Sequence, residues 1–141
     1  MDYEKLKDFL NTNDRFCRHC GIQLTHVAPG EAEAELQITP SVLNGRDVVQ
    51  GGAIMTLADF AFAGAANAMG HSTVSTGLNI NFIRPGSGSK LIAKARKIHH
   101  GRSTCLYQVN VTDEQGKLVA SVNVSGFTVD EKPVIGEEPW Q

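Results

Sequence analysis

The sequence predicts an α+β fold in which an antiparallel sheet of about six strands wraps around one long central helix. Residues 52–69 form the predicted helix, which is apolar or small on almost every side, and a helix of that kind is normally buried. Two strand-like segments precede it and four follow it, with no helices alternating between strands, which is typical of an antiparallel sheet. We therefore expect residues 1–141 to form a single domain.

The composition excludes several classes of partner. Charged residues make up 20% of the chain, the formal net charge is -2, and no run of Lys or Arg stands out, so we expect neither nucleic-acid binding nor attraction to an anionic membrane. The longest apolar stretch, residues 53–66, is too short to span a bilayer and contains a carboxylate. The first ten residues lack an apolar signal region, and we expect a cytoplasmic protein.

The three cysteines do not indicate a metal site. Cys17 and Cys20 form a C-x-x-C pair, but a zinc site would need a second ligand pair, and Cys105 lies alone in a strand-like segment. A redox pair would follow a strand in a βαβ unit, and no strand precedes this one. We expect ordinary reduced cysteines and no bound metal.

An N-terminal helical segment is predicted over residues 1–20. Apolar residues recur at helical spacing, but polar residues interrupt the pattern near residues 11–14. This indicates one or two short helices, with Asn13 or Asp14 capping the second and Gly21 ending it.

The predicted strands follow from alternation and turn residues. Residues 22–27 and 31–38 form a hairpin, in which period two places Glu31, Glu33 and Glu35 on one solvated face rather than in an acidic site. Gly70 closes the central helix. Turn signals then divide the remaining strands, and residues 130–141 are expected to be a tail that is loose or packed on a neighbouring surface. These strands cover residues 74–83, 91–99, 104–112 and 117–129.

The start and the middle of the central helix contain candidate functional groups. The N–H groups of Gly51 and Gly52 have no intrahelical partner, the helix dipole is positive there, and glycine lets a ligand approach the backbone. The simpler reading is a tight turn into the helix. Asp59 is costly on a buried helix unless it is paired or used, and Thr56 on the same face is one possible partner.

Several motifs together resemble a known family. The sequence is similar to hotdog-fold acyl-CoA thioesterases of the phenylacetic-acid-degradation type over about residues 15–129. Gln50 departs from the family pattern, because a His usually precedes the two glycines, and Gln can donate a hydrogen bond but carries no proton at neutral pH. The motifs are Asn44-Gly45, Gln50-Gly51-Gly52, Thr56-Leu57-Ala58-Asp59, Phe62-Ala63, Asn67 and the segment from Asn79 to Gly86, which ends in a Phe-x-Arg-Pro turn.

The resemblance implies hydrolysis of a small or aryl acyl-CoA. Asp59 would act as general base or nucleophile, and the Gly51 N–H would stabilise the oxyanion. CoA belongs to the substrate, so no separate cofactor is expected. The family forms homodimers with two sites at the interface, often paired into a dimer of dimers, that is, a homotetramer. The alternative is a non-catalytic acyl-CoA-binding or regulatory module, which the Gln50 departure keeps open.

The spacing of Gly51 and Asp59 independently predicts a site shared between two chains. Gly51 and Asp59 are eight residues apart, or about 12 Å along one helix, whereas a reacting carbon must lie within roughly 3 Å of both groups. We therefore expect Gly51 of one chain to act with Asp59 of another.

Other residues are candidates with simpler alternatives. Asn44 would orient water or the carbonyl, or would only form the loop before Gly45. Arg84 would pair with CoA phosphates, or would form a structural ion pair. The nearby residues that could also pair with CoA phosphates are Lys90, His100 and Arg102. The other expected substrate-binding residues are Gly52, Phe62, Ser75, Thr76 and Pro85.

Overall fold

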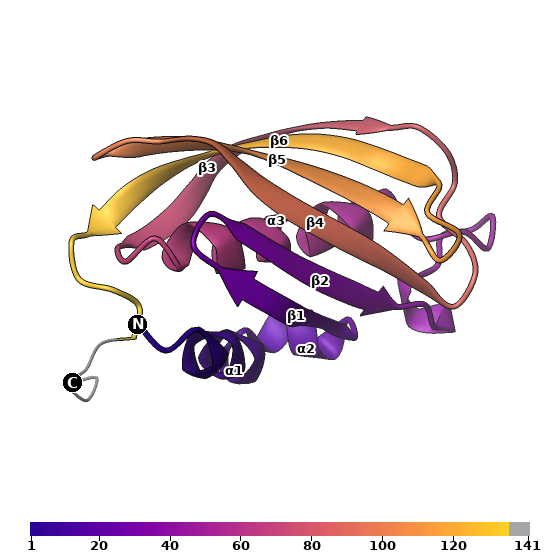
Figure 1. Cartoon of the computed structure of the whole chain (residues 1–141). Coiled ribbons are helices and arrows are strands. Elements are labelled where there is room, and N and C mark those ends of the chain that lie inside the picture. Colours follow the sequence, from indigo (N-terminus) through magenta and orange to yellow (C-terminus); the bar gives the residue numbers. More distant parts are fainter. Residues whose placement is uncertain (136–141) are drawn as a thin grey trace.

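The computed structural model describes residues 1–135 (Figure 1). It contains three α-helices, one 3-10 helix and six strands among these residues. In chain order they are α1 (Tyr3–Asn13), α2 (Arg15–His19), β1 (Ile22–Ala28), β2 (Glu31–Gln37), η1 (Pro40–Val42), α3 (Gly51–Asn67), β3 (Ser72–Phe82), β4 (Lys90–His100), β5 (Thr104–Asp113) and β6 (Leu118–Asp130).

The six strands form one antiparallel sheet in the order β1-β2-β4-β5-β6-β3. The sheet curves around α3, which lies on one of its faces, and α1 and α2 pack beside β1 (Figure 1). The predicted architecture is confirmed. The element boundaries shift by one or two residues: α3 begins at Gly51 and ends at Asn67, and β3 begins at Ser72.

Small side chains on α3 allow the sheet to approach it closely. A Cβ on Gly64 would lie 2.9 Å from Leu24 Cδ2 and 3.2 Å from Ala32 Cβ, so no larger residue fits without movement. Ten of the seventeen α3 residues are buried. Helix stability here comes from this packing rather than from propensity.

The end of α3 is tied to β3 by the buried side chain of Asn67. Its amide nitrogen donates to the carbonyl of Ala63 at 2.8 Å, and its oxygen accepts the Thr73 N–H at 2.9 Å. A buried amide with both ends bonded stabilises the turn, because unpaired buried polar groups are costly. This turn sets where β3 starts relative to the helix.

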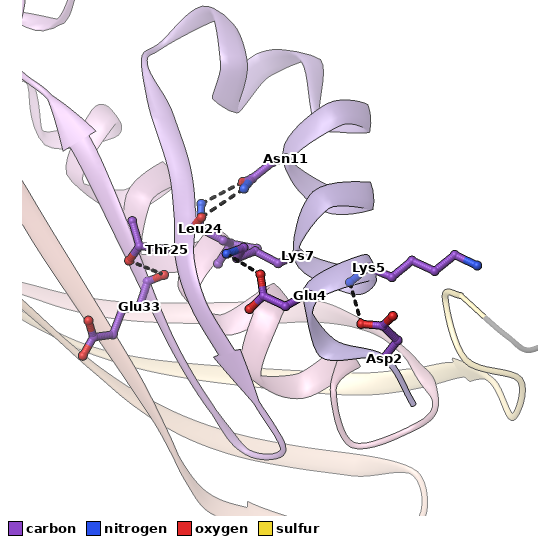
Figure 2. Close-up of polar contacts among 8 residues, drawn as sticks. All are labelled: Asp2, Glu4, Lys5, Lys7, Asn11, Leu24, Thr25 and Glu33. Atoms are coloured by element: carbon purple, nitrogen blue, oxygen red, sulfur yellow. Dashed lines mark hydrogen bonds and ion pairs between the residues drawn. The ribbon is translucent and has the colours of Figure 1, made fainter.

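The two edges of the sheet differ. Along β1, Asn11 of α1 donates to the Leu24 carbonyl at 3.0 Å and accepts the Leu24 N–H at 2.7 Å (Figure 2). The register also shifts between Leu24 and His26. A bulge and a covering helix both prevent further strand pairing. At the other edge, β3 has β6 as its only strand neighbour among residues 1–135.

The three predicted outward glutamates lie on the solvent side of β2, as expected. Glu33 and Glu35 form ion pairs with Lys94 at 3.6 Å and Lys90 at 3.4 Å, and Glu31 contacts His26 at 3.1 Å. Such exposed pairs contribute little stability. They account for the glutamates without a binding site.

The remaining sequence expectations concern cysteines, metals and the tail. Cys17, Cys20 and Cys105 are free, and no group of His, Cys, Asp or Glu within residues 1–135 is arranged to hold a metal ion. No helix in the described part is long and apolar enough to cross a membrane. In the expected tail, Ile135 is buried against the core. Residues 136–141 of that tail lie outside the described residues.

Replacing Asn11 by alanine should destabilise the protein, because Leu24 loses both backbone partners. We expect the free energy of unfolding to fall by about 1–3 kcal/mol, measured by urea denaturation. The matched control is Asn13→Ala, which removes only an exposed bond from Asn13 to the Phe9 carbonyl within α1. Equal losses in the two variants would contradict the protective role of Asn11 at the β1 edge.

Candidate active site

Asp59 lies on the one stripe of α3 that the sheet leaves uncovered. The stripe comprises Gly52, Met55, Thr56, Asp59 and Ala63, which recur at helical spacing and are half-buried or exposed. Asp59 faces a cavity of about 340 Å³. The walls of this cavity are Asp14, Phe16, Cys17, Met55, Thr56, Phe60, Ala63 and Leu78, together with Asp59 itself.

The environment of Asp59 makes its carboxylate more basic than usual. Burial is the main cause that raises its pKa, the hydrogen bond with Ser75 opposes the rise, and the negative charge of Asp14 adds to it. Thr56 is not the partner, because its hydroxyl donates to the Gly52 carbonyl at 2.8 Å. Ser75, predicted as a substrate-binding residue, is therefore the hydrogen-bond partner of Asp59, whereas Thr56, the partner considered from sequence, is engaged elsewhere.

The start of α3 presents free backbone donors. Gln50 is the N-cap, and its side-chain oxygen accepts the Ala53 N–H at 3.1 Å. Among the hydrogen bonds of residues 1–135, none is donated by the N–H of Gly51 or Gly52. With the positive end of the helix dipole, these donors make a position suited to an oxyanion.

A side chain lies close to the backbone of each glycine. A Cβ on Gly51 would lie 3.1 Å from the ring of Phe82, and one on Gly52 would lie 2.6 Å from the side-chain oxygen of Gln50. Gly51 faces a second cavity, of about 380 Å³. Its walls are Asn44, Val48, Val49, Gly51, Ile54, Phe82, Ile83, Arg84, Pro85 and Gly86.

The two cavities share no residue. Asp59 opens into the first and Gly51 into the second, although both belong to the same helix. With about 12 Å between them along the helix axis, one bound carbonyl cannot reach both. Each cavity by itself thus contains only one of the two groups that the sequence predicts for the reaction, either Asp59 or Gly51.

Three other predicted residues have placements that bear on their roles. Asn44 accepts the N–H of Arg46 at 2.9 Å and that of Val48 at 3.4 Å, so its oxygen organises the loop before α3. Thr76 is exposed and does not line the Asp59 cavity. Phe62 is 1% exposed and packs edge-on against Tyr107 in the core. The aromatic residue of α3 that lines the Asp59 cavity is Phe60, and Phe16 lines it from α2.

The residues expected to bind CoA phosphates differ in the contacts that their side chains make. Arg84 donates through Nε to the Leu118 carbonyl at 2.9 Å, and with Pro85 it lines the Gly51 cavity. Its side chain is exposed, and no ion pair to it occurs in the described part of the chain. Lys90 instead pairs with Glu35, and His100 is bonded to the Tyr107 hydroxyl at 2.7 Å.

The N-terminal segment supplies cavity walls that sequence reasoning missed. Asp14 caps α2 by accepting the Cys17 N–H at 3.0 Å, and together with Phe16 these residues face Asp59. Burial raises the pKa of the Cys17 thiol, and the charge of Asp14 raises it further, so this thiol is not activated. The helix cap was visible in the sequence, but its contact with α3 was not.

A sheet curved around one long helix, with an acidic residue in mid-helix and free donors at the helix start, defines the hotdog class of thioesterases. A model of the Thioesterase superfamily matches residues 47–120, which include α3, Asp59 and most of the sheet. The chain belongs to this superfamily and is a thioester hydrolase.

Within this superfamily the chain is PaaI-like. It is 36% identical to the acyl-coenzyme A thioesterase PaaI of Escherichia coli over 109 residues, covering 77% of this chain and 78% of the relative. The structure of the E. coli PaaI protein, from the phenylacetic acid degradation operon, matches with a TM-score of 0.87 over 92% of this chain and 95% of that one, at 29% identity.

Two further relatives extend the comparison. A putative esterase of Archaeoglobus fulgidus is 30% identical over 129 residues, which cover 91% of this chain and 84% of the relative. A 1,4-dihydroxy-2-naphthoyl-CoA hydrolase of Listeria monocytogenes is 31% identical over 102 residues, covering 70% of this chain and 83% of the relative. The similarity spans most of each relative.

The pH dependence of turnover should report on the surroundings of Asp59. If the ionised carboxylate is the active form, kcat/KM falls as pH drops through the raised pKa, above the ordinary aspartate value of about 3.9. Ser75→Ala removes an interaction that lowers this pKa and should move the acidic limb to higher pH. Asp14→Asn keeps a capping side chain but removes a negative charge, and it should move the limb to lower pH. Shifts in the same direction would contradict the assignment.

Proposed function

We propose that the chain hydrolyses the thioester of a small or aryl acyl-CoA to the free acid and CoA. The observation that carries the proposal is the division of the chemistry on α3, where Asp59 and the Gly51 N–H face separate cavities. Each active site then combines Asp59 of one chain with Gly51 of another. The two sites of a dimer are equivalent, as expected for a two-fold interface.

The reaction follows from these groups. The Asp59 carboxylate accepts a proton from a water molecule, and the water oxygen adds to the thioester carbonyl carbon. The Gly51 N–H of the other chain donates to the carbonyl oxygen as it becomes negative. The C–S bond then breaks, and CoA leaves as the thiol after taking up the proton. Direct attack by the Asp59 carboxylate, through a mixed anhydride, uses the same geometry.

The sheet edges support a specific way of pairing two chains. Asn11 blocks the β1 edge, while the outer edge of β3 has no strand beside it in residues 1–135. Ser75, which contacts Asp59, and Phe82, which covers Gly51, both lie on β3. Pairing along β3 would therefore place the two halves of each site near the interface. It would also cover Met55, which is 40% exposed on α3.

The cavity walls support the substrate class. Phe16, Met55, Phe60 and Leu78 make the surface around Asp59 mainly apolar, which suits a small or aromatic acyl group. Two of the relatives carry names tied to aromatic acids, one from phenylacetic acid degradation and one a naphthoyl-CoA hydrolase. The exposed guanidinium of Arg84, beside the Gly51 cavity, is placed to bind a CoA phosphate.

Asp59→Asn should abolish most turnover of a panel of aliphatic and aryl acyl-CoAs, because the amide cannot accept the proton. We expect kcat to fall about 10²–10⁴-fold, measured by trapping the released CoA thiol. The matched control is Asp8→Asn on the exposed side of α1, which should keep native turnover. Acyl-CoA binding without turnover in the native protein would instead support the non-catalytic module.

Gly51→Pro tests the oxyanion donor without removing the helix start. Proline is favoured at the first helical position, and the Gln50 backbone (φ -64°, ψ 138°) is compatible with a following proline. Removing this N–H should lower kcat about 10²–10³-fold. Gly51→Ala adds the same first carbon against Phe82 but keeps the N–H, and it should retain most of the activity. Equal losses in both variants would point to a steric effect and contradict the donor role.

A further inference from the structure

The cavity beside Asp59 contains a second carboxylate and no basic side chain. We call it the acyl cavity, because its mainly apolar walls suit an acyl group. Asp14 forms part of the wall, and the remaining walls are apolar apart from the Cys17 thiol and the Thr56 hydroxyl. Burial raises the pKa of that thiol, so the thiol stays neutral. Asp59 has a part in the proposed reaction, whereas Asp14 adds a negative charge that the reaction does not use.

Asp14 is held at the wall of the acyl cavity by the ends of two helices. It closes α1, where its N–H donates to the Leu10 carbonyl at 3.0 Å, and it caps α2, where its Oδ1 accepts the Cys17 N–H at 3.0 Å. One turn earlier on α1, Asn11 is bonded to the backbone of Leu24 and so ties this segment to β1 (Figure 2). Within residues 1–135 the second carboxylate oxygen of Asp14 has no hydrogen-bond partner.

No cation within residues 1–135 neutralises the two carboxylates. Neither Asp14 nor Asp59 forms an ion pair in this part of the chain. Arg15 and Arg18 follow Asp14 on α2, but neither of them lines the acyl cavity. The Arg18 guanidinium donates instead to the Thr12 carbonyl at 3.1 Å. The two carboxylates act on each other, because the charge of Asp14 adds to the rise in the pKa of Asp59.

The other half of the proposed site supplies no counter-ion for the acyl end of the substrate. The walls of the Gly51 cavity include one charged residue, Arg84. This guanidinium is the candidate for binding a CoA phosphate, which lies at the opposite end of the substrate from the acyl group. An acyl group bound beside Asp59 therefore meets negative charge without a compensating positive one.

We propose that Asp14 determines specificity by charge and excludes acyl groups that end in a carboxylate. A third negative charge in a partly desolvated cavity is repelled by the two carboxylates, and no cation offsets its lost hydration. Repulsion of the wrong ligand is one way to obtain specificity. A neutral acyl end avoids this repulsion, and a cationic end is attracted. The inference rests on the proposed function, which places the acyl group beside Asp59, and adds the charge class of that group.

Three acyl-CoAs that share a six-carbon chain test the charge selection. They are hexanoyl-CoA, adipoyl-CoA with a terminal carboxylate and 6-aminohexanoyl-CoA with a terminal amine, both of which are charged at about pH 8. In the native protein, kcat/KM for adipoyl-CoA should be about 10–100-fold below that for hexanoyl-CoA. Asp14→Asn retains a capping side chain and should narrow this gap about tenfold, while it lowers the ratio of 6-aminohexanoyl-CoA to hexanoyl-CoA. A loosened helix cap would instead move all three substrates in one direction.

Asp8→Asn is the matched control for this variant. It removes the same charge from the exposed side of α1, outside the acyl cavity, and should leave both ratios unchanged. Thermal unfolding followed by circular dichroism verifies that both variants fold. The charge selection is overturned if the native protein uses adipoyl-CoA as well as hexanoyl-CoA, or if folded Asp14→Asn leaves both ratios unchanged.

Binding measurements separate the charge selection from the proposed function. The corresponding S-alkyl-CoA thioethers cannot be hydrolysed, and isothermal titration calorimetry gives their Kd values for the native protein and Asp14→Asn. We expect the same charge order in these Kd values. If this order is found while no acyl-CoA is hydrolysed, the proposed function fails and the charge selection stands. Hydrolysis of hexanoyl-CoA without a charge order among the thioethers overturns the charge selection alone, and the absence of both binding and hydrolysis overturns both.

Discussion

The close packing of α3 against the curved sheet is the constraint on which the rest of the structure depends. Alanine and glycine on the inward sides of α3 let β1 and β2 approach until Gly64 has no room for a methyl group. The sheet then covers the helix except for one stripe, and Asp59 falls within it. The same packing desolvates that carboxylate in part and fixes Ser75 beside it. The fold and the chemistry proposed for Asp59 therefore depend on the same contacts.

The helix also sets the limit of what one chain can do. A straight helix keeps Gly51 and Asp59 about 12 Å apart whatever the surrounding side chains do. Its first turn offers unpaired donors, and its middle offers a carboxylate with a raised pKa, but each opens into its own cavity. The open β3 edge and the exposed stripe of α3 are the surfaces that a second chain would complete, whereas Asn11 closes the opposite edge.

Periodicity explains why much of this could be predicted. The apolar pattern around Asp59 and the alternation of the strands directly encode burial, so the sheet, the helix and the solvated glutamates of β2 followed from sequence. The position of Phe62 did not follow from sequence. Ala63 lines the cavity, but Phe62 stands one position earlier on α3, and the rotation of the helix between these two positions turns the Phe62 ring away from the cavity and toward Tyr107. Local spacing cannot resolve such a boundary between two faces.

Contacts between distant segments were the other part that sequence could not provide. Asp14 and Phe16 lie more than forty residues before Asp59 in the sequence. They face Asp59 only because α1 and α2 pack beside β1. Asn44 was open between a chemical and a loop-forming role, and its bonds to Arg46 and Val48 support the loop. Its direct part in the reaction remains a prediction.

Mixing two inactive variants tests the shared site most directly. In a dimer of Asp59→Asn with Gly51→Pro, one site contains both substitutions and the other contains native Asp59 and native Gly51. Denaturing and refolding an equal mixture should therefore restore about one quarter of native turnover, because half of randomly formed dimers are mixed and each has one intact site. If both groups acted within one chain, every chain would lack one of them. A mixture as inactive as its components, with mixed dimers verified by mass spectrometry, would contradict the shared site.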